Sequence, residues 1–310
     1  MPKFSVVISV YNKAEFVAET LNSVMAQSVQ DFEIVILNDG STDDSEAVIK
    51  PYIADPRVGY FSEENMGAAA GRNYVIQKAK GEYIALLDAD DIWKPFYLEE
   101  QLKLIEKYRT YKIFATNSEI LKKGKTSGRQ FSVDISNKEP IVVDYFEASN
   151  LDSILHSSTT VVKKEVFDTV GLYDTGIKSG QDTDLYVRMG LRYKVVFSPK
   201  ICVRYRVIEN SLFRSSKKLS DKPSFEAYEK YETTNPALKK FLDISRYSLC
   251  LIAKLEGNKT GFERNYKKID LANLNKKQRF LLVQSPKNLK QLLKLKNSIA
   301  QLGIKLSVFK

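Results

Sequence analysis

Histidine and cysteine are nearly absent from this 310-residue chain, which has one histidine, His156, and two cysteines, Cys202 and Cys250. A single histidine excludes a zinc site built from several imidazole ligands. Two cysteines cannot form a disulfide framework, and they suit a reducing compartment. The chain also lacks an apolar run of the ~18 residues that a membrane-spanning helix needs. Its first residues enter a strand pattern without a cleavage signal, so we expect a cytoplasmic protein.

Two common nucleotide-binding signatures are missing as well. No G-x-G-x-x-G motif follows the first predicted strand, which excludes the dinucleotide fingerprint. No G-x-x-x-x-G-K-S/T motif is present, which excludes a P-loop. Any nucleotide must therefore be held by other groups.

Acidic charge is scarce in the last third of the chain. The net charge is +10, and residues 211–310 contain 22 Lys and Arg against 8 Asp and Glu. The rest of the chain is mildly acidic. This asymmetry predicts two parts with different partners, residues 1–210 and residues 211–310.

Apolar runs alternate with amphipathic segments in the first ninety residues. Strands are predicted at Phe4–Val10, Phe32–Leu37, Val58–Phe61 and Tyr83–Leu87, and helices at about Ala14–Ala26, Asp43–Lys50 and Met66–Lys80. This alternation is typical of a doubly wound α/β sheet with right-handed crossovers. Further strands are expected at Lys112–Ile120, Ser157–Lys163, Val195–Phe197 and Ile201–Val207.

Three carboxylates follow the fourth predicted strand: Asp88, Asp90 and Asp91. In an extended segment alternate side chains share a face, so Asp88 and Asp90 can point the same way. Their mutual repulsion is relieved by a divalent cation, and oxygen-only ligands suit Mg²⁺ or Mn²⁺. The segment therefore predicts a platform for a metal ion and a diphosphate. The alternative is an ordinary polar turn.

Other polar residues follow the first two strands. Ligands of open α/β sheets bind at the carboxyl ends of the strands, where Tyr11, Asn12 and Asp39 are expected. Asp39 can accept a hydrogen bond from a base such as uracil, although guanine also offers donors. Its alternative role is a turn with Gly40. Arg72, in a small-residue helix start, can bind an anion, or that start can simply pack closely on the sheet.

The segment Gly171–Gly190 supplies another candidate. Asp182 is predicted near the start of a helix, where a carboxylate is stabilised in its ionised form and can accept a proton. The alternative is a helix cap. From the end of the last strand onward, a basic, hydroxyl-rich segment that includes Arg206 and Arg214 can close over a diphosphate, or can be a solvated linker. We assign His156 to a structural role.

The tail, residues 211–310, is predicted to be helical. Asn235 and Pro236 start one helix and Gly257 ends it. A last helix from Ser285 to Gly303 has its leucines on one face, which is compatible either with an interfacial membrane helix or with a packed surface helix.

The motifs SVYN, LNDGSTDDS, GAAAGRN, LLDADD and GQDTDLYVR, in this order between residue 4 and about residue 207, resemble those of the inverting family-2 glycosyltransferases with the GT-A fold. The resemblance implies a mixed, Rossmann-like sheet, a nucleotide-diphosphate sugar as donor, with UDP preferred, a Mn²⁺ or Mg²⁺ ion, and a saccharide or lipid-linked saccharide as acceptor. No nucleic acid partner is expected.

The same resemblance implies roles for individual residues. Asp182 matches the catalytic base, and Asp90 the metal ligand. The expected nucleotide-binding residues are Ser9, Tyr11, Asn12, Asp39, Arg72 and Asp88. Gln181, Arg206 and Arg214 are candidates for a loop at the diphosphate or acceptor.

Two positions depart from the pattern of the family. The residue before the base is Gln181 rather than the usual Glu, and the downstream strand has no histidine for the metal. These departures are the support for the alternative function, a non-catalytic protein that binds a nucleotide sugar, a membrane or a partner.

Overall fold

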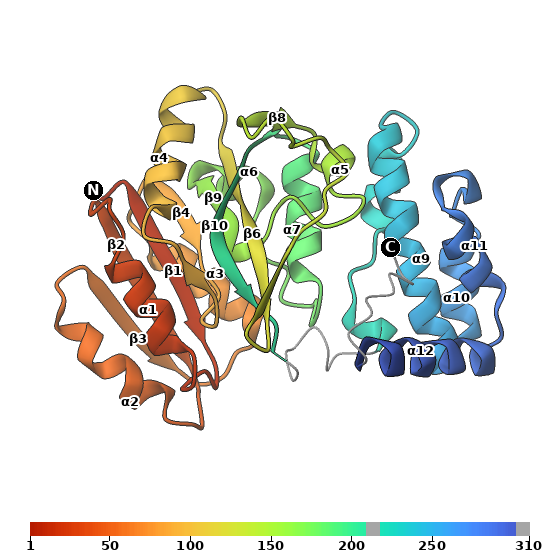
Figure 1. The fold of residues 1–310 in the computed structure, drawn as a ribbon, viewed down its shortest axis with the longest axis horizontal. Helices are drawn as coiled ribbons and strands as arrows, with labels where there is room; N and C mark the ends of the chain where they lie inside the picture. The colour runs from red at the N-terminus through yellow and green to blue at the C-terminus, as the bar shows by residue number, and fades with distance from the viewer. Residues whose placement is uncertain (209–217, 302–310) are drawn as a thin grey trace. The chain divides into compact units, whose positions relative to one another are not determined.

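The computed structural model describes residues 1–208 and 218–301, with side chains as far as residue 295. The chain divides into two compact units, Met1–Ser211 and Leu212–Lys310. Figure 1 shows that the first unit is a sheet with helices packed on it and that the second is a group of helices.

Four parallel strands form one half of the sheet, in the spatial order β3-β2-β1-β4 (Figure 1). They are β1 (Phe4–Val10), β2 (Phe32–Asp39), β3 (Val58–Glu63) and β4 (Tyr83–Leu86). Between them lie α1 (Val17–Met25), α2 (Ser45–Ile49) with the 3-10 turn Lys50–Ala54, and α3 (Ala68–Lys78). The predicted α/β alternation is confirmed, although each helix is shorter than the sequence pattern suggested.

The other half of the sheet is mixed. It contains β9 (Thr160–Lys163), β6 (Ile113–Lys122), β10 (Val195–Arg206) and β5 (Ile92–Trp93), with β7 (Lys125–Gly128) beside β6 and β8 (Ile141–Val143) beside β10. Its helices are α4 (Tyr97–Lys107), α5 (Tyr145–Ala148), α6 (Glu165–Val170) and α7 (Gln181–Gly190). Strand β9 runs antiparallel to both β4 and β6. The sheet is therefore the predicted doubly wound mixed sheet.

Strand β10 corrects one prediction. The sequence suggested two strands, Val195–Phe197 and Ile201–Val207; Pro199, which lies between them, has no N–H to donate to a ladder. The structure has one strand, and its pairing with β6 shifts register between Ser198 and Val203. These irregularities accommodate the proline without ending the strand.

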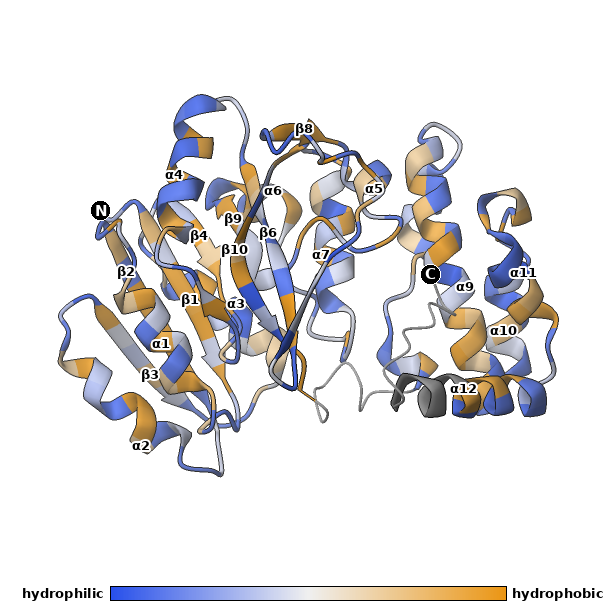
Figure 2. Cartoon of the chain, viewed as in Figure 1, coloured by the Kyte–Doolittle hydropathy of each residue, from blue (hydrophilic) through white to orange (hydrophobic). Residues whose placement is uncertain are grey.

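The hydrophobic core of the first unit lies between the sheet and its helices. Strand β1 is buried along almost its whole length, and α1 contributes Val17, Leu21 and Val24. The central strands are mainly hydrophobic in Figure 2. This burial on both faces explains why β1 reads as a continuous apolar run.

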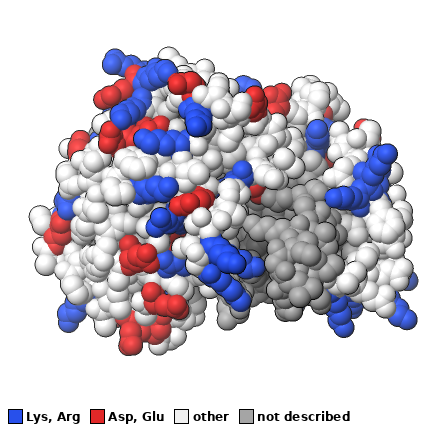
Figure 3. All heavy atoms as spheres, viewed as in Figure 1, with Lys and Arg blue, Asp and Glu red and all other residues white. Residues whose placement is uncertain are grey.

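The second unit contains four α-helices within residues 218–301: α9 (Pro236–Glu256), α10 (Lys259–Tyr266), α11 (Lys276–Val283) and α12 (Pro286–Gln301). Three 3-10 turns lie at Leu219–Asp221, Glu226–Tyr231 and Leu271–Asn273. As predicted, the Asn235 side chain caps α9, and Gly257 ends it in the left-handed conformation. The charged side chains visible on this unit in Figure 3 are mostly Lys and Arg.

The leucine face of α12 is used inside the second unit. Leu289 is fully buried, and Leu292 and Leu293 pack against the same core, which includes Tyr247 and Leu281. These leucines are not available to a lipid surface, so within the described side chains the packed-helix alternative is the correct one. Gly303, the predicted end of this helix, lies outside the described residues. Among the described helices, none combines the length and the apolar character that crossing a bilayer requires.

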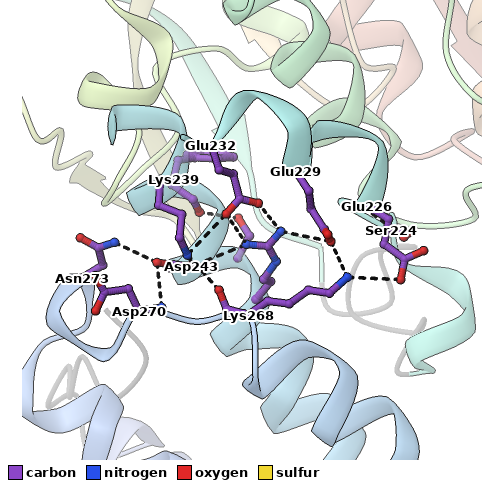
Figure 4. Close-up of polar contacts among 12 residues, drawn as sticks. Ser224, Glu226, Glu229, Glu232, Lys239, Asp243, Lys268, Asp270 and Asn273 are labelled. Atoms are coloured by element: carbon purple, nitrogen blue, oxygen red, sulfur yellow. Dashed lines mark hydrogen bonds and ion pairs between the residues drawn. The ribbon is translucent and has the colours of Figure 1, made fainter. Parts of the chain in front are cut away.

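A buried arginine organises the polar interior of the second unit. The Arg246 side chain is 2% exposed and binds the carboxylate of Glu232, with Nη1 3.0 Å from Oε2. Asp243, which is fully buried, bonds Lys239, Asp270 N and Asn273. Figure 4 shows this network together with the pair Lys268–Glu229. Burial of these charges is tolerable because each has an opposite partner.

Candidate active site

Each of the three carboxylates after β4 has its own partners. Arg72 Nη2 lies 2.8 Å from Asp88 Oδ1, and Lys13 Nζ lies 2.5 Å from Asp90 Oδ2. Asp91 accepts from Ser158 Oγ at 2.5 Å and from the backbone N–H of Arg206 at 2.8 Å. The segment is therefore more than a solvated turn, because each carboxylate is held by a residue from another part of the chain.

The different surroundings also give the three carboxyl groups different pKa shifts. Burial acts to raise the pKa of Asp88, but the neighbouring groups, with Arg72 the strongest and Lys13 among them, together hold that pKa below its ordinary value. Burial raises the pKa of Asp90 in spite of Lys13. Burial, reinforced by the charge of Asp90, raises the pKa of Asp91 well above its ordinary value. Asp88 is thus the carboxylate that stays ionised most readily.

The predicted nucleotide side lies at the carboxyl ends of β1 and β2. Asp39 is 1% exposed and accepts the backbone N–H of Met66 at 2.8 Å. Asn12 has a positive φ of 51° and accepts the N–H of Thr42 at 2.8 Å, so it ties the two loops together. Tyr11 is 46% exposed, which leaves its ring free to stack on a ligand.

Ser9 and Gly71 explain how α3 reaches this edge. A Cβ on Gly71 would lie 2.5 Å from Ser9 Oγ and 3.4 Å from Asp39 Oδ2. Only glycine allows so close an approach of helix to sheet. The small-residue helix start therefore packs closely on the sheet, and Arg72, one residue later, is directed to the Asp88 carboxylate.

Asp182 lies in the first turn of α7, within electrostatic range of Asp88. Gly180 precedes the helix in the left-handed conformation, with φ of 89°. Ser157 Oγ donates to Asp182 Oδ1 at 3.4 Å. Burial raises the pKa of Asp182, and Arg72 acts in the opposite direction. Arg72 thus stands within electrostatic range of Asp88 and Asp182, and joins the two predicted parts of the site.

The candidate loop residues are placed differently from one another. Gln181 is 4% exposed. The guanidinium of Arg206 pairs with Glu19 at 2.5 Å and lies 4.8 Å from the Phe16 ring centroid, so in this structure it is directed to α1. Arg214 lies outside the described residues.

His156 is the main residue that the sequence did not assign to the site. One ring nitrogen of His156 and one oxygen each of Asp88 and Asp91 lie within 4.8 Å of one another. Burial lowers the pKa of His156 to about 4, although Asp88 acts to raise it, so the ring is neutral near pH 7 and can be a metal ligand.

The sheet pairing brings His156 and its neighbours there. Because β9 pairs antiparallel with β4, the residues just before β9 lie beside the residues just after β4. Ser158 consequently accepts the Asp88 N–H at 3.2 Å. The sequence offered only the hydroxyl-rich SST segment after His156 as a signal.

This sheet, with acidic residues after β4 and a further aspartate at the start of α7, defines a glycosyltransferase of the GT-A type. The chain belongs to glycosyltransferase family 2, whose family model, "Glycosyl transferase family 2", matches residues 5–171.

Named relatives agree with this family. An uncharacterized glycosyltransferase of Rickettsia typhi is 30% identical over 214 residues, which cover 66% of this chain and 64% of the relative. TuaG of Bacillus subtilis, a glycosyltransferase assigned to teichuronic acid biosynthesis, is 28% identical over 72% of this chain and 86% of its own length. The chain thus spans a little under two thirds of the rickettsial relative.

A solved structure shows the same fold. Residues 1–349 of S. aureus TarS, in complex with UDP-GlcNAc, match with a TM-score of 0.59 and 18% identity over 86% of this chain and 89% of that chain. A second crystal structure of the same protein contains UDP and has a TM-score of 0.55. The predicted GT-A fold is confirmed.

Proposed function

We propose that the chain transfers a sugar from a nucleotide-diphosphate sugar, with a UDP-sugar as the expected donor, to an acceptor hydroxyl with inversion. The observation that carries this proposal is the position of Arg72, which is ion-paired with Asp88 and within electrostatic range of Asp182. Asp88 belongs to the donor side and Asp182 to the acceptor side. The UDP and UDP-GlcNAc in the TarS structures support the choice of nucleotide.

The nucleotide is assigned to the edge formed by β1, β2 and α3. Tyr11 supplies an exposed ring for the base, and Asp39 keeps a second carboxylate oxygen beside Gly71. Ser9 and Asn12 shape this edge, and Arg72 and Asp88 lie where the ribose and diphosphate would follow.

Asp182 is the proposed base. It accepts the proton of the acceptor hydroxyl as that oxygen attacks the anomeric carbon from the face opposite to the diphosphate. Burial keeps its carboxylate out of bulk water, and Arg72 helps to keep it ionised. Position 181 is Gln here rather than the Glu that is usual in the family. Of residues 181 and 182, Asp182 is therefore the one with a carboxylate.

The residues after β4 fit a divalent cation. Asp90 already binds a cationic group, the Lys13 ammonium. One ligand atom from each of Asp88, Asp91 and His156 lies within 4.8 Å of the others, and Asp90 is not a member of that group. We propose Asp90 as the ligand of Mn²⁺ or Mg²⁺, and Asp88, Asp91 and His156 as residues with further oxygen and nitrogen atoms available to the ion. When bound, the ion supplies positive charge that stabilises the leaving diphosphate.

The acceptor is a saccharide or a lipid-linked saccharide in this proposal, and the work of the enzyme is the synthesis of cell-surface polysaccharide or glycolipid. The assignment of the relative TuaG to teichuronic acid biosynthesis supports it. We place the reaction in the cytoplasm, with residues 1–210 as the catalytic part and residues 211–310 as a basic part that contacts an anionic membrane surface.

Two measurements test the proposal. UDP should raise the melting temperature of the protein, and Mn²⁺ should increase that effect, since a ligand that binds only the folded state stabilises it. UDP-sugars should then be hydrolysed slowly, with water in place of the acceptor. If UDP binds and no UDP-sugar is hydrolysed, the chain is a non-catalytic nucleotide-sugar-binding protein instead.

A further inference from the structure

Asn73, the last residue of the GAAAGRN motif, binds a segment that lies 100 residues further along the chain. Its Nδ2 donates to the backbone oxygen of Tyr173 at 2.8 Å, and its Oδ1 accepts the backbone N–H of Tyr173 at 2.9 Å. A carboxamide has both a donor and an acceptor, so a single asparagine can satisfy both backbone groups of one residue. The two bonds together fix the position and the orientation of the backbone at Tyr173.

Tyr173 is held by a second residue of α3. The guanidinium carbon of Arg72, which precedes Asn73 in the helix, lies 5.6 Å from the centroid of the Tyr173 ring, within the range of a cation–π contact. Arg72 at the same time pairs with Asp88 at 2.8 Å. Two consecutive residues of α3 thus connect Tyr173, through its ring and through its backbone, to the predicted donor side.

The chain at Tyr173 is also bound to α7, the helix that carries Asp182. Arg188 of α7 donates from Nη2 to the backbone oxygen of Leu172 at 2.8 Å. The same guanidinium pairs with Asp184, also on α7, at 2.8 Å. The segment around Tyr173 therefore joins α3 to α7.

The side chain of Tyr173 acts on the proposed base. Burial raises the pKa of Asp182, and the Tyr173 hydroxyl is among the groups that act to lower it. Ser157, whose Oγ donates to Asp182 at 3.4 Å, also acts on Tyr173. The Tyr173 hydroxyl is buried and has no partner of ordinary hydrogen-bond geometry among the described residues, so it is not committed to another group. The place at which Tyr173 is held consequently affects the carboxylate of Asp182.

We propose that Asn73 is a positioning residue for the base: by holding the backbone of Tyr173 on α3, it fixes the Asp182 carboxylate relative to Arg72 and Asp88. This inference rests on the proposed function, because it takes Asp182 as the base. Asn73 itself touches neither donor nor acceptor. Because transfer with inversion needs the base and the leaving group on opposite sides of the anomeric carbon, a small error in their separation lowers the rate.

Asn73→Ala removes both hydrogen bonds, and Asn117→Ala is its matched control. The Asn117 amide likewise donates to a distant backbone oxygen, that of Pro199 at 3.2 Å, and accepts a backbone N–H, that of Ser118 at 2.8 Å. Asn117 lies on β6 of the same unit, is 7% exposed and has no role in the proposed site. Both substitutions therefore remove a buried amide of the same kind.

The first measurement is the hydrolysis of UDP-GlcNAc, UDP-glucose and UDP-galactose with Mn²⁺, below the melting temperature of each variant. Calorimetric titration with UDP counts the intact donor sites, which separates slower chemistry from a smaller folded fraction. In Asn73→Ala, kcat per UDP-binding site should fall roughly 10- to 100-fold, with the donor KM and the UDP affinity of the parent. Asn117→Ala should keep the kcat of the parent.

The second measurement does not depend on activity. The Tyr173 amide donates to Asn73, so a peptide that covers residues 171–180 should exchange its amide hydrogens faster in Asn73→Ala and at the rate of the parent in Asn117→Ala. Asn73→Asp keeps the acceptor of this bond and loses the donor to the Tyr173 oxygen. It should lose less kcat than Asn73→Ala, and it takes the place of that variant if the alanine protein does not fold.

Four results would overturn the positioning role. They are an unchanged kcat in Asn73→Ala, or in Asn73→Asp where that variant takes its place; an equal loss of kcat in Asn117→Ala; unchanged exchange of residues 171–180; and weaker UDP binding in Asn73→Ala, which would assign Asn73 to the donor. A parent protein that binds UDP and hydrolyses none of the three donors contradicts the proposed function instead.

Discussion

Lys13 and Asp90 form an ion pair across the carboxyl edge of the sheet. Lys13 Nζ lies 2.5 Å from Asp90 Oδ2, and the two side chains are 25% and 16% exposed. Lys13 follows β1 and Asp90 follows β4, and these strands are neighbours in the sheet. The ammonium group occupies the position at Asp90 where we propose the metal ion, so a metal that binds there must displace it.

Replacing Lys13 with Met should therefore increase the affinity for Mn²⁺. A partly exposed ion pair contributes about 1 kcal/mol, which corresponds to a factor of roughly 5 in affinity. Titration of Mn²⁺ followed by electron paramagnetic resonance, without nucleotide, measures this affinity. Lys3→Met is the matched control, since Lys3 pairs with Glu82 at the other end of the strands and should leave Mn²⁺ binding unchanged.

Asp90→Asn tests the same metal site by removing the carboxylate that we propose as the ligand. It should abolish the Mn²⁺-dependent part of UDP binding and leave the fold intact. Two results contradict the metal assignment: UDP affinity in the parent that is the same with and without Mn²⁺, or weaker Mn²⁺ binding in Lys13→Met.

Asp182→Asn should bind donor normally and lose turnover, because the amide keeps the shape of the side chain but cannot accept the proton. General-base catalysis contributes ~10²–10⁴-fold, so hydrolysis of the donor should fall at least that much. Asp168→Asn, an exposed substitution in the same unit, is the control. Asp184→Asn is unsuitable as a control, since Asp184 pairs with Arg188 at 2.8 Å and should lower the melting temperature when changed. Turnover that survives in Asp182→Asn would place the base elsewhere.

The pH dependence follows from the environment of Asp182. Burial raises the pKa of this carboxyl above the ordinary value of 3.8, so the acidic limb of the rate profile should lie above that pH. Arg72 opposes the shift; Arg72→Met should therefore raise the pKa further and move the limb to higher pH. Donor hydrolysis at saturating donor measures the limb apart from donor affinity. A limb that stays in place or moves to lower pH shows that Asp182 does not control the rate.

Arg246→Met should strongly destabilise the second unit. The substitution removes Arg246 from Glu232 and Asp243 and leaves them Lys239 as their remaining cationic partner among the described residues; breaking a buried pair costs up to about 3–5 kcal/mol. Hydrogen exchange of α9 amides measures the loss. Arg264→Met, which removes an exposed arginine 3.9 Å from Glu226, should change α9 protection by less than about 1 kcal/mol. Equal effects of the two substitutions would show that burial of the network does not matter.

The basic second unit should bind vesicles that contain anionic lipid, with each nearby Lys or Arg contributing on the order of 1 kcal/mol before screening by salt. Phe280 and Val283 are 55% and 73% exposed and lie on the same side of α11, so they can insert beside these charges. Flotation at physiological salt should be stronger with anionic than with neutral vesicles, and Phe280→Ser with Val283→Ser should weaken it. Equal flotation with both lipids contradicts the membrane proposal.

The sequence by itself determined the features that depend on neighbouring residues. A buried parallel strand must be apolar on both faces, so β1, β2 and β4 are visible as runs, and the polar residues that follow them mark the carboxyl edge. The cap at Asn235 and the left-handed Gly257 are likewise set within one turn of a helix. Asp182 could be located at the start of a helix for the same reason.

Only the tertiary structure decided which distant residues meet. His156 and Ser158 reach Asp88 because β9 inserts antiparallel beside β4, and a pairing over 70 residues leaves no periodic trace in the sequence. The same holds for Lys13 and Asp90, which meet across 77 residues of sequence. The leucines of α12 show the limit most simply: an amphipathic pattern states that one face is apolar, and the fold decides that this face meets the core of the second unit.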